Sequence, residues 1–373
     1  MNKSQKSAII YLIIILLPLF EITEYFYNYI SKSDSQFAAY SLIIIYLLLF
    51  LIATNKIRII LIFILLYYFL YILLPPTPWN NNASQTIPFV LTIALLITFS
   101  YNEIVFSKKY VNYLFIFTLF YITLFFVSAE LNGLTKIENR LYLNGFVISH
   151  AFSYSIIALG LFIYKYKNKA LGFIFMCLSV LVGARSGLVL FLLTLAYIYY
   201  ENIISKRINV LSALTFIIFI LMISLNNPVL DSTLDTFKGL DWTNINLFGN
   251  DKYSAAFTAS RSFIWNSTLF EVSQKFSTIE LIFGRGPLAP FEFSESLGLG
   301  RIWLHNDFFN ILYAYGIFGL ILYVSLLIKF YFKTKNIYVL AYIFIAAFIN
   351  GFYYYDTPLI LTILTLIASK NIN

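Results

Sequence analysis

The sequence predicts an all-α polytopic membrane protein, and three observations predict it: composition, the length of the apolar runs and the charge of the loops. Of the 373 residues 60% are apolar and only 11% are charged, and the mean hydropathy is +0.82. A soluble domain carries about 25% charged residues, so a soluble enzyme, a nucleic-acid binder and a disordered chain are excluded. In a membrane protein the excess of basic residues, which gives a pI near 9.2, first reflects topology and is not by itself evidence of a polyanionic partner.

Apolar runs long enough to cross a hydrocarbon core of roughly 30 Å recur along the whole chain. They predict about twelve transmembrane helices in a single integral membrane domain, residues 1–373. The expected spans are 8–27, 37–53, 57–74, 86–101, 111–128, 146–164, 170–184, 187–203, 208–225, 306–328, 336–353 and 358–369. The first span lacks a small-residue cleavage site, so we expect an uncleaved anchor.

The charges of the loops predict the orientation of these spans. Lysines and arginines gather in the short loops on one side, where only Glu103 and Glu201 oppose them. The positive-inside rule makes that side cytoplasmic and places both termini there. These inner loops are too short for a nucleotide-binding domain, and no P-loop occurs. The long segment 226–305, between the ninth and tenth spans, is expected on the outer face, where any chemistry would lie.

Metal and disulfide chemistry have no support in the residue pattern. Cys177 is the single cysteine and lies inside an apolar run, so no internal disulfide can form. No carboxylate cluster or His/Cys spacing indicates a metal site, and no cofactor is expected.

Arg185 lies between two apolar runs in Gly183-Ala184-Arg185-Ser186-Gly187. A rise of ~1.5 Å per helical residue places it roughly 22 to 28 Å from the cytoplasmic ends of those runs. An unpaired guanidinium at that depth costs several kcal/mol unless it snorkels. It is either the tip of a hairpin reaching lipid headgroups or a cation held for an anionic group. We favour the second, because glycine and serine permit close approach to the backbone.

The outer segment holds three further arginines. Segment 257–276 predicts an amphipathic helix with Arg261 inside its apolar stripe, where it either snorkels or meets an anion. Arg285 and Arg301 each stand beside glycines, so an oxyanion could meet the side chain and backbone N–H groups together. One such motif is usually a turn. Together with Arg185 they favour a site that holds a diphosphate without metal.

Two histidines are candidates for proton transfer. His305 precedes Asn306, the expected N-cap of span 306–328. His305 could exchange a proton near neutral pH, or it could be a capping-turn residue bonded to backbone. His150, ten residues after Arg140 and early in a span, is a secondary candidate.

Taken in order, these motifs resemble the bacterial O-antigen polymerase and O-antigen ligase superfamily of membrane glycosyltransferases. The match is carried by the Arg185 hairpin, by Arg261 with Trp265, by Gly284-Arg285-Gly286, and by His305-Asn306 leading into Tyr315-Gly316 and Gly319. It covers about residues 183–320, and the first 140 residues match only in hydropathy. Arg140 and His150 fall where the family often has an arginine and an Asn-rich turn, but that asparagine is absent here.

The resemblance implies a function and a location. The donor is a glycan on undecaprenyl diphosphate, the acceptor is a second lipid-linked repeat unit, and no metal or cofactor takes part. The implied place is the bacterial inner membrane, with the active site on the periplasmic face. Candidate partners are the lipid bilayer and a chain-length regulator protein; nucleic acid is not one.

The resemblance also implies roles for particular residues. Arg261 and His305 would be catalytic, with His305 acting on the acceptor hydroxyl. Binding of the diphosphate and substrate would fall to the remaining candidates, which are Arg185, Arg285, Arg301, Asn306, Arg140 and His150.

Three functions remain open. We favour an O-antigen polymerase, because the chain is compact and poor in motif residues outside the shared core. The nearest alternative is an O-antigen ligase, which transfers finished polymer to lipid A-core. A different class is a flippase for lipid-linked repeat units, but the chain lacks the internal repeat common in transporters.

Overall fold

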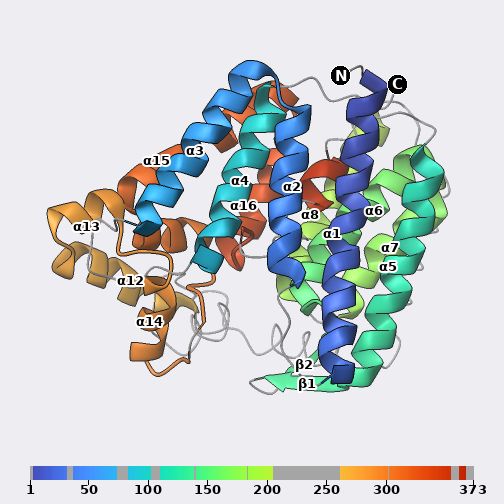
Figure 1. Cartoon of the computed structure of the whole chain (residues 1–373). Coiled ribbons are helices and arrows are strands. Elements are labelled where there is room, and N and C mark those ends of the chain that lie inside the picture. The colour runs from blue at the N-terminus through green and yellow to red at the C-terminus, as the bar shows by residue number, and fades with distance from the viewer. Residues whose placement is uncertain are drawn as a thin grey trace.

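The computed structural model describes residues 3–31, 37–73, 83–101, 110–137, 140–182, 184–204, 261–300, 302–353 and 361–366. These ranges are mostly helical, and the helices form a bundle (Figure 1). The helices of the first half are α1 (Lys3–Ser31), α2 (Phe37–Ile52), α3 (Asn55–Leu73), α4 (Ala83–Tyr101), α5 (Val111–Asn132), α6 (Ser149–Tyr166), α7 (Lys169–Leu181) and α8 (Arg185–Ile204). Those of the second half are α12 (Arg261–Lys275), α13 (Thr278–Phe283), α14 (Ala289–Ser296), α15 (Asp307–Thr334) and α16 (Ile337–Ile349).

The prediction of a mostly helical membrane protein agrees with the apolar character of these helices. Among the described residues, three helices are long and apolar enough to cross a membrane: Gln5–Ser31, Val111–Asn132 and Asp307–Thr334. Shorter apolar helices accompany them at Ile43–Ile52, Pro88–Ser100, Lys169–Leu181, Ser186–Glu201 and Ile337–Ile349. The expected span 208–225, and all of 358–369 except 361–366, lie outside the described residues. The count of twelve spans stays a prediction.

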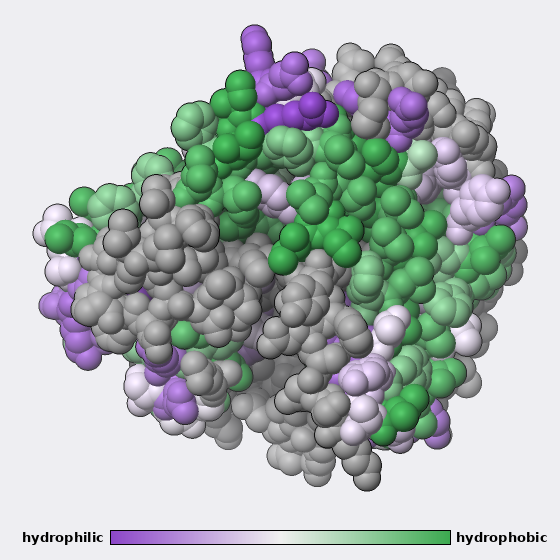
Figure 2. Space-filling view, viewed as in Figure 1, coloured by the Kyte–Doolittle hydropathy of each residue, from purple (hydrophilic) through white to green (hydrophobic). Residues whose placement is uncertain are grey.

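The surface of the bundle carries an apolar belt between more hydrophilic ends (Figure 2). Large apolar side chains are exposed on several helices, including Phe63 at 66%, Ile116 at 62% and Ile321 at 60%. Exposed apolar area of this extent marks contact with lipid or another apolar partner. The connection between α2 and α3 lies at one end of the bundle, and a β-hairpin lies at the opposite end, which we call the hairpin end (Figure 1).

The hairpin is a departure from the all-α prediction. Strand β1 (Leu134–Ile137) pairs antiparallel with β2 (Arg140–Leu143), and Leu134 lies opposite Leu143. The segment lies between two apolar runs, so an analysis of membrane spans does not detect its strands. The backbone N–H of Leu143 donates to the carbonyl of Val182 at 3.3 Å, which ties the hairpin to the turn between α7 and α8.

Helix α6 is buried along most of its length and packs closely on α7. A Cβ atom at Gly160 would lie 2.8 Å from the carbonyl oxygen of Gly172, and one at Gly172 would lie 2.6 Å from that of Gly160. The two glycines therefore allow the backbones of α6 and α7 to approach, as small residues do in membrane helix pairs. This packing holds the first turn of α6 in place at the hairpin end.

Helix α15 is broken at Gly316, whereas the sequence predicted one continuous span from residue 306. Gly316 has φ 66° and ψ −168°. The break frees the carbonyls of Tyr313 and Ala314, which accept from the backbone N–H groups of Arg285 at 2.9 Å and Gly286 at 3.0 Å. The Gly284-Arg285-Gly286 segment is thus docked into the broken helix.

Candidate functional site

The candidate site is a polar cluster at the hairpin end, around the side chain of Asn350. Asn350 closes the C-terminus of α16, and its Oδ1 accepts from Arg261 Nη2 at 2.7 Å. Its backbone carbonyl accepts from Trp303 Nε1 at 3.3 Å, and the rings of Trp303 and His305 meet edge to face at 5.5 Å. Arg261 and His305, which lie on separate elements, are therefore brought together over the end of α16.

Helix α6 contributes a second side to the cluster. His150, in its first turn, lies within electrostatic reach of both Arg261 and His305. Tyr154, one turn later, has its ring 6.3 Å from that of His150, and Ser186 of α8 adjoins its hydroxyl. Three residues that the sequence singled out, Arg261, His150 and His305, are thus gathered in one place.

A buried carboxylate ties the base of the cluster together. Asp307 accepts from the backbone N–H groups of Phe352 at 2.7 Å and Tyr353 at 3.1 Å, and from the Tyr323 hydroxyl at 3.3 Å. Gly351, at φ 81°, makes this turn possible, since a Cβ there would lie 3.1 Å from Asp307 Oδ1. Asp307 therefore fixes the start of α15 against the chain that follows α16.

Two asparagines hold the strained backbone of His305, which has φ 52°. Asn306 is the predicted N-cap of α15: its Oδ1 accepts from Phe308 N at 2.9 Å, and its Nδ2 donates to the Phe348 carbonyl at 3.0 Å. Asn310 accepts from Leu304 N at 3.0 Å. A non-glycine residue at positive φ persists only where its surroundings enforce it. These bonds give Asn306 a structural role beneath the site.

The environment of His305 keeps its imidazole neutral. Burial, and then the positive charge of Arg261, lower the pKa of His305 from its usual 6.5 to about 3, against the opposing effect of Asn350. No hydrogen bond of standard geometry reaches its buried Nδ1, Asn350 Nδ2 or the Tyr154 hydroxyl among the described residues, although Asn350 lies close to both His305 and Tyr154. Unpaired buried polar atoms are costly. These loosely bonded polar atoms in one cluster are compatible with a site that receives a polar ligand.

Arg285 lies in a different environment. Its Nε donates to Glu280 at 2.9 Å, its Nη1 to Glu271 at 2.9 Å, and its Nη2 to the Lys275 carbonyl at 3.1 Å. The guanidinium also lies 4.2 Å from the ring centroid of Phe276. Burial acts to lower the pKa of Arg285, but these acidic partners raise it overall. Arg285 thus joins α12 to α13, and the structure does not place it with Arg261.

The remaining predicted residues are described only in part. Arg185 begins α8 beside Ser186, so its backbone borders the cluster, but its side chain lies outside the described residues. Arg140 begins β2, and again only its backbone is described. Arg301 lies outside the described residues.

Sequence reasoning missed Asn350, Trp303, Tyr154 and Asp307 as members of the cluster. A signal was present in Asn350-Gly351, which interrupts an apolar run. Polar residues within membrane segments are expensive and are often functional.

The cluster offers a permanent cation, a neutral imidazole and an amide. A guanidinium can hold a phosphate or carboxylate through paired hydrogen bonds, and a neutral imidazole can take up a proton. No group of three or more His, Cys, Asp or Glu in the described part of the chain is placed to hold a metal ion. The arrangement therefore suits binding of an anion next to a proton transfer.

In comparisons with known proteins, no family model, curated protein or solved structure matches this chain.

Proposed function

We propose that the protein is a membrane glycosyltransferase of the O-antigen polymerase type, which joins oligosaccharide repeat units carried on undecaprenyl diphosphate. The observation that carries this proposal is the Arg261–Asn350–His305 cluster at the hairpin end of an apolar helical bundle. The order of motifs along residues 183–320 supports it.

In the proposed reaction Arg261 binds the diphosphate of the donor. The acceptor hydroxyl oxygen attacks the anomeric carbon, the bond from that carbon to the phosphate oxygen breaks, and the diphosphate leaves with the electron pair. The guanidinium stabilises the charge that develops on the leaving group. The hydroxyl proton passes to His305.

The basicity of His305 would depend on the substrate. Arg261 is one cause of the low pKa of His305 in the empty site. A bound diphosphate offsets the charge of Arg261, so the pKa of His305 rises when the donor arrives. Burial, the larger cause of the low pKa, remains, so His305 would be a stronger base in the loaded enzyme than in the empty site.

The proposed location is the bacterial inner membrane, with both termini cytoplasmic and the hairpin end on the periplasmic side. The distribution of lysine and arginine in the short loops supports this orientation. Arg185, Arg140 and Arg301 are proposed as further contacts for the diphosphate or the glycan, and a chain-length regulator as a partner protein.

The test is a gel of lipopolysaccharide from a deletion strain, together with analysis of its undecaprenyl-linked intermediates. Core bearing a single repeat unit, with no ladder, supports a polymerase. Bare core with long lipid-linked polymer would make the protein a ligase. Bare core with single repeats trapped on the cytoplasmic leaflet would make it a flippase and overturn the roles given to Arg261 and His305.

A further inference from the structure

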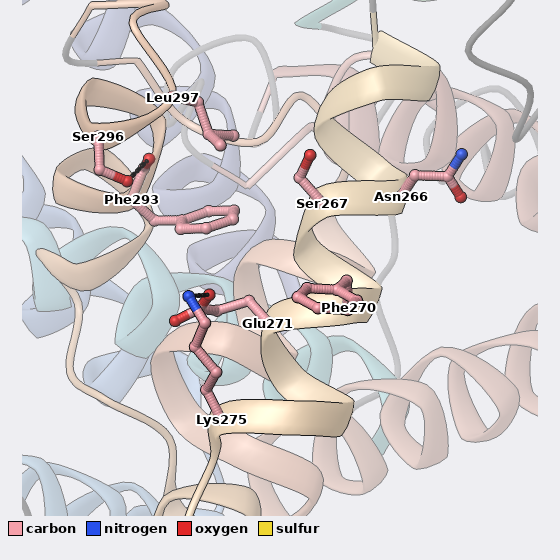
Figure 3. A pocket seen from close by; sticks show the side chains of 8 residues that line it. All are labelled: Asn266, Ser267, Phe270, Glu271, Lys275, Phe293, Ser296 and Leu297. Carbon is pink, nitrogen blue, oxygen red and sulfur yellow. Dashed lines mark hydrogen bonds and ion pairs between the residues drawn. The ribbon is translucent and has the colours of Figure 1, made fainter.

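A cavity lies between α12 and α14, with a volume of about 600 Å³. Sites for small molecules typically measure roughly 300–1,000 Å³. Its walls come from two short helices that pack on α15. The residues that line it are Asn266, Ser267, Phe270, Glu271 and Lys275 of α12 and Phe293, Ser296 and Leu297 of α14 (Figure 3).

The lining combines aromatic rings with hydrogen-bonding groups. In Figure 3 the Ser267 hydroxyl and the Phe293 ring point into the space between the two helices. No hydrogen bond is formed by the Ser267 hydroxyl within the part of the chain that the structure describes. Phe270 is 61% exposed, so one of its faces is open to a ligand.

An ion pair forms the charged part of the wall. Lys275 Nζ lies 2.8 Å from Glu271 Oε2, and Glu271 Oε1 also accepts from Arg285. Burial acts to raise the pKa of Glu271, but Lys275 and Arg285 lower it overall, so the carboxylate is ionised at neutral pH. An ammonium carries three donors, so Lys275 retains N–H groups for a ligand.

Packing and hydrogen bonds hold the frame of the cavity. Phe293 stacks on Tyr313 of α15 with ring centroids 5.1 Å apart. The Ser294 hydroxyl accepts from Ile302 N at 3.0 Å and lies 2.8 Å from the Gly300 carbonyl, which anchors α14 to the chain that follows it. A site that is already formed loses little entropy when it binds.

This chemistry selects one class of ligand. A purely apolar molecule would strip water from the Glu271–Lys275 pair without replacing its hydrogen bonds. The charges of Lys275 and Arg285 are balanced by Glu271 and Glu280, so no net positive charge attracts an anion, and one carboxylate in the wall is too few for a metal ion. A sugar presents hydroxyl groups at its rim and C–H groups on its face, so it can satisfy both the polar groups and the aromatic rings.

The position of the cavity relates it to the polar cluster. Arg261 and Ser267 are both on α12, six residues and therefore roughly 9 Å apart along the helix axis. At ~100° per residue Ser267 lies roughly 120° around the helix from Arg261, so a glycan with its reacting end at Arg261 would extend around α12 to place later sugars near this cavity.

We propose that the cavity between α12 and α14 is a saccharide subsite, which holds sugars of the glycan distant from the bond being made. This inference rests on the proposed function for the identity of its ligand. Phe270 and Phe293 provide the stacking surface, and Ser267 with the Glu271–Lys275 pair provides the hydrogen bonds.

The test uses lipid-linked repeat units isolated from the deletion strain and the free oligosaccharide released from them by mild acid. Oligosaccharide binding to the purified full chain is measured by calorimetry, and polymerisation of the lipid-linked form is measured separately. Ser267→Trp fills the cavity, and Ser273→Trp places the same side chain on an exposed position of the same helix. Phe270→Ala trims an exposed ring and leaves the core intact.

We expect Ser267→Trp and Phe270→Ala to weaken oligosaccharide binding by about tenfold or more, and Ser273→Trp to leave it unchanged. Arg261→Ala should keep oligosaccharide binding while it loses polymerisation. Unchanged binding in both cavity variants, in a protein that still polymerises, overturns the subsite and leaves the function standing. If the wild type binds the oligosaccharide in a way that depends on the cavity but does not polymerise, the proposed function is overturned and the subsite stands.

Discussion

Arg261 and Arg285 lie in the same region of the chain, and the structure gives them opposite settings. Arg285 is 10% exposed and satisfies two carboxylates and a carbonyl from neighbouring elements. The described contacts of Arg261 are of another kind: it donates to the side chain of Asn350 and lies within electrostatic reach of His150 and His305. The ion pairs of Arg285 support the fold, whereas Arg261 lies in the polar cluster that we propose binds the diphosphate.

The largest expected effect comes from replacing Arg261. Arg261→Ala should lower the rate of polymerisation by about 100-fold or more, because the charge on the leaving diphosphate loses its nearest proposed donor. Arg261→Lys should recover part of the rate, since it keeps the charge and loses the planar fork. The measurement is turnover of purified lipid-linked repeat units, with flipping of the same lipid as the control. Loss of flipping in Arg261→Ala would favour the transporter.

The corresponding change at Arg285 should act on stability. Arg285→Ala leaves Glu271 and Glu280 without their shared cation, and we expect a loss of about 3 kcal/mol in the free energy of unfolding. Thermal unfolding in detergent measures this effect. Lys275→Ala is the matched control, because its ion pair with Glu271 has a side chain that is 60% exposed and should contribute less than about 1 kcal/mol. Equal effects of the two changes would contradict the structural role of Arg285.

Replacing Asn350 tests the comparison further, because Asn350 accepts a hydrogen bond from Arg261. Asn350→Ala removes the acceptor that orients the guanidinium, and we expect kcat/KM to fall by about tenfold. Asn336→Ala is the control: it removes the N-cap of α16, whose side chain accepts from Tyr338 N at 3.1 Å, and should cost about 1 kcal/mol of stability without a change in kcat/KM. A normal kcat/KM in folded Asn350→Ala would remove Asn350 from the site.

The last expected effect concerns pH. The unfolded chain takes up a proton at His305 near pH 6.5, but the folded protein does so only near its lowered pKa of about 3. Between these values the unfolded state binds more protons, so this group makes the protein less stable as the pH falls from 6.5 towards 3. Unfolding measured across that range should show a shallower loss in His305→Gln than in the wild type. Parallel curves would contradict the buried, neutral state of His305.

The residue pattern predicted local features well and long-range neighbours poorly. Asn306 caps α15 as expected, because an N-cap needs only the residues next to it. Gly284-Arg285-Gly286 predicted an anion site from its glycines, and that stays a prediction; in the structure the motif docks on α15, since a Cβ at Gly284 would lie 2.3 Å from the Ala314 carbonyl oxygen. The partner of that motif is thirty residues away, and spacing along the chain does not reveal it.

The amino-acid sequence by itself determined that the chain is apolar and mostly helical, and it supplied the candidates Arg261, His305 and His150. It could do so because hydropathy and helix capping depend on composition and on near neighbours. Only the tertiary structure decided which arginine stands beside the histidines and which is neutralised by Glu271 and Glu280. That choice depends on the break at Gly316 and on the turn at Gly351, where segments far apart in the chain meet at distances of a few ångströms.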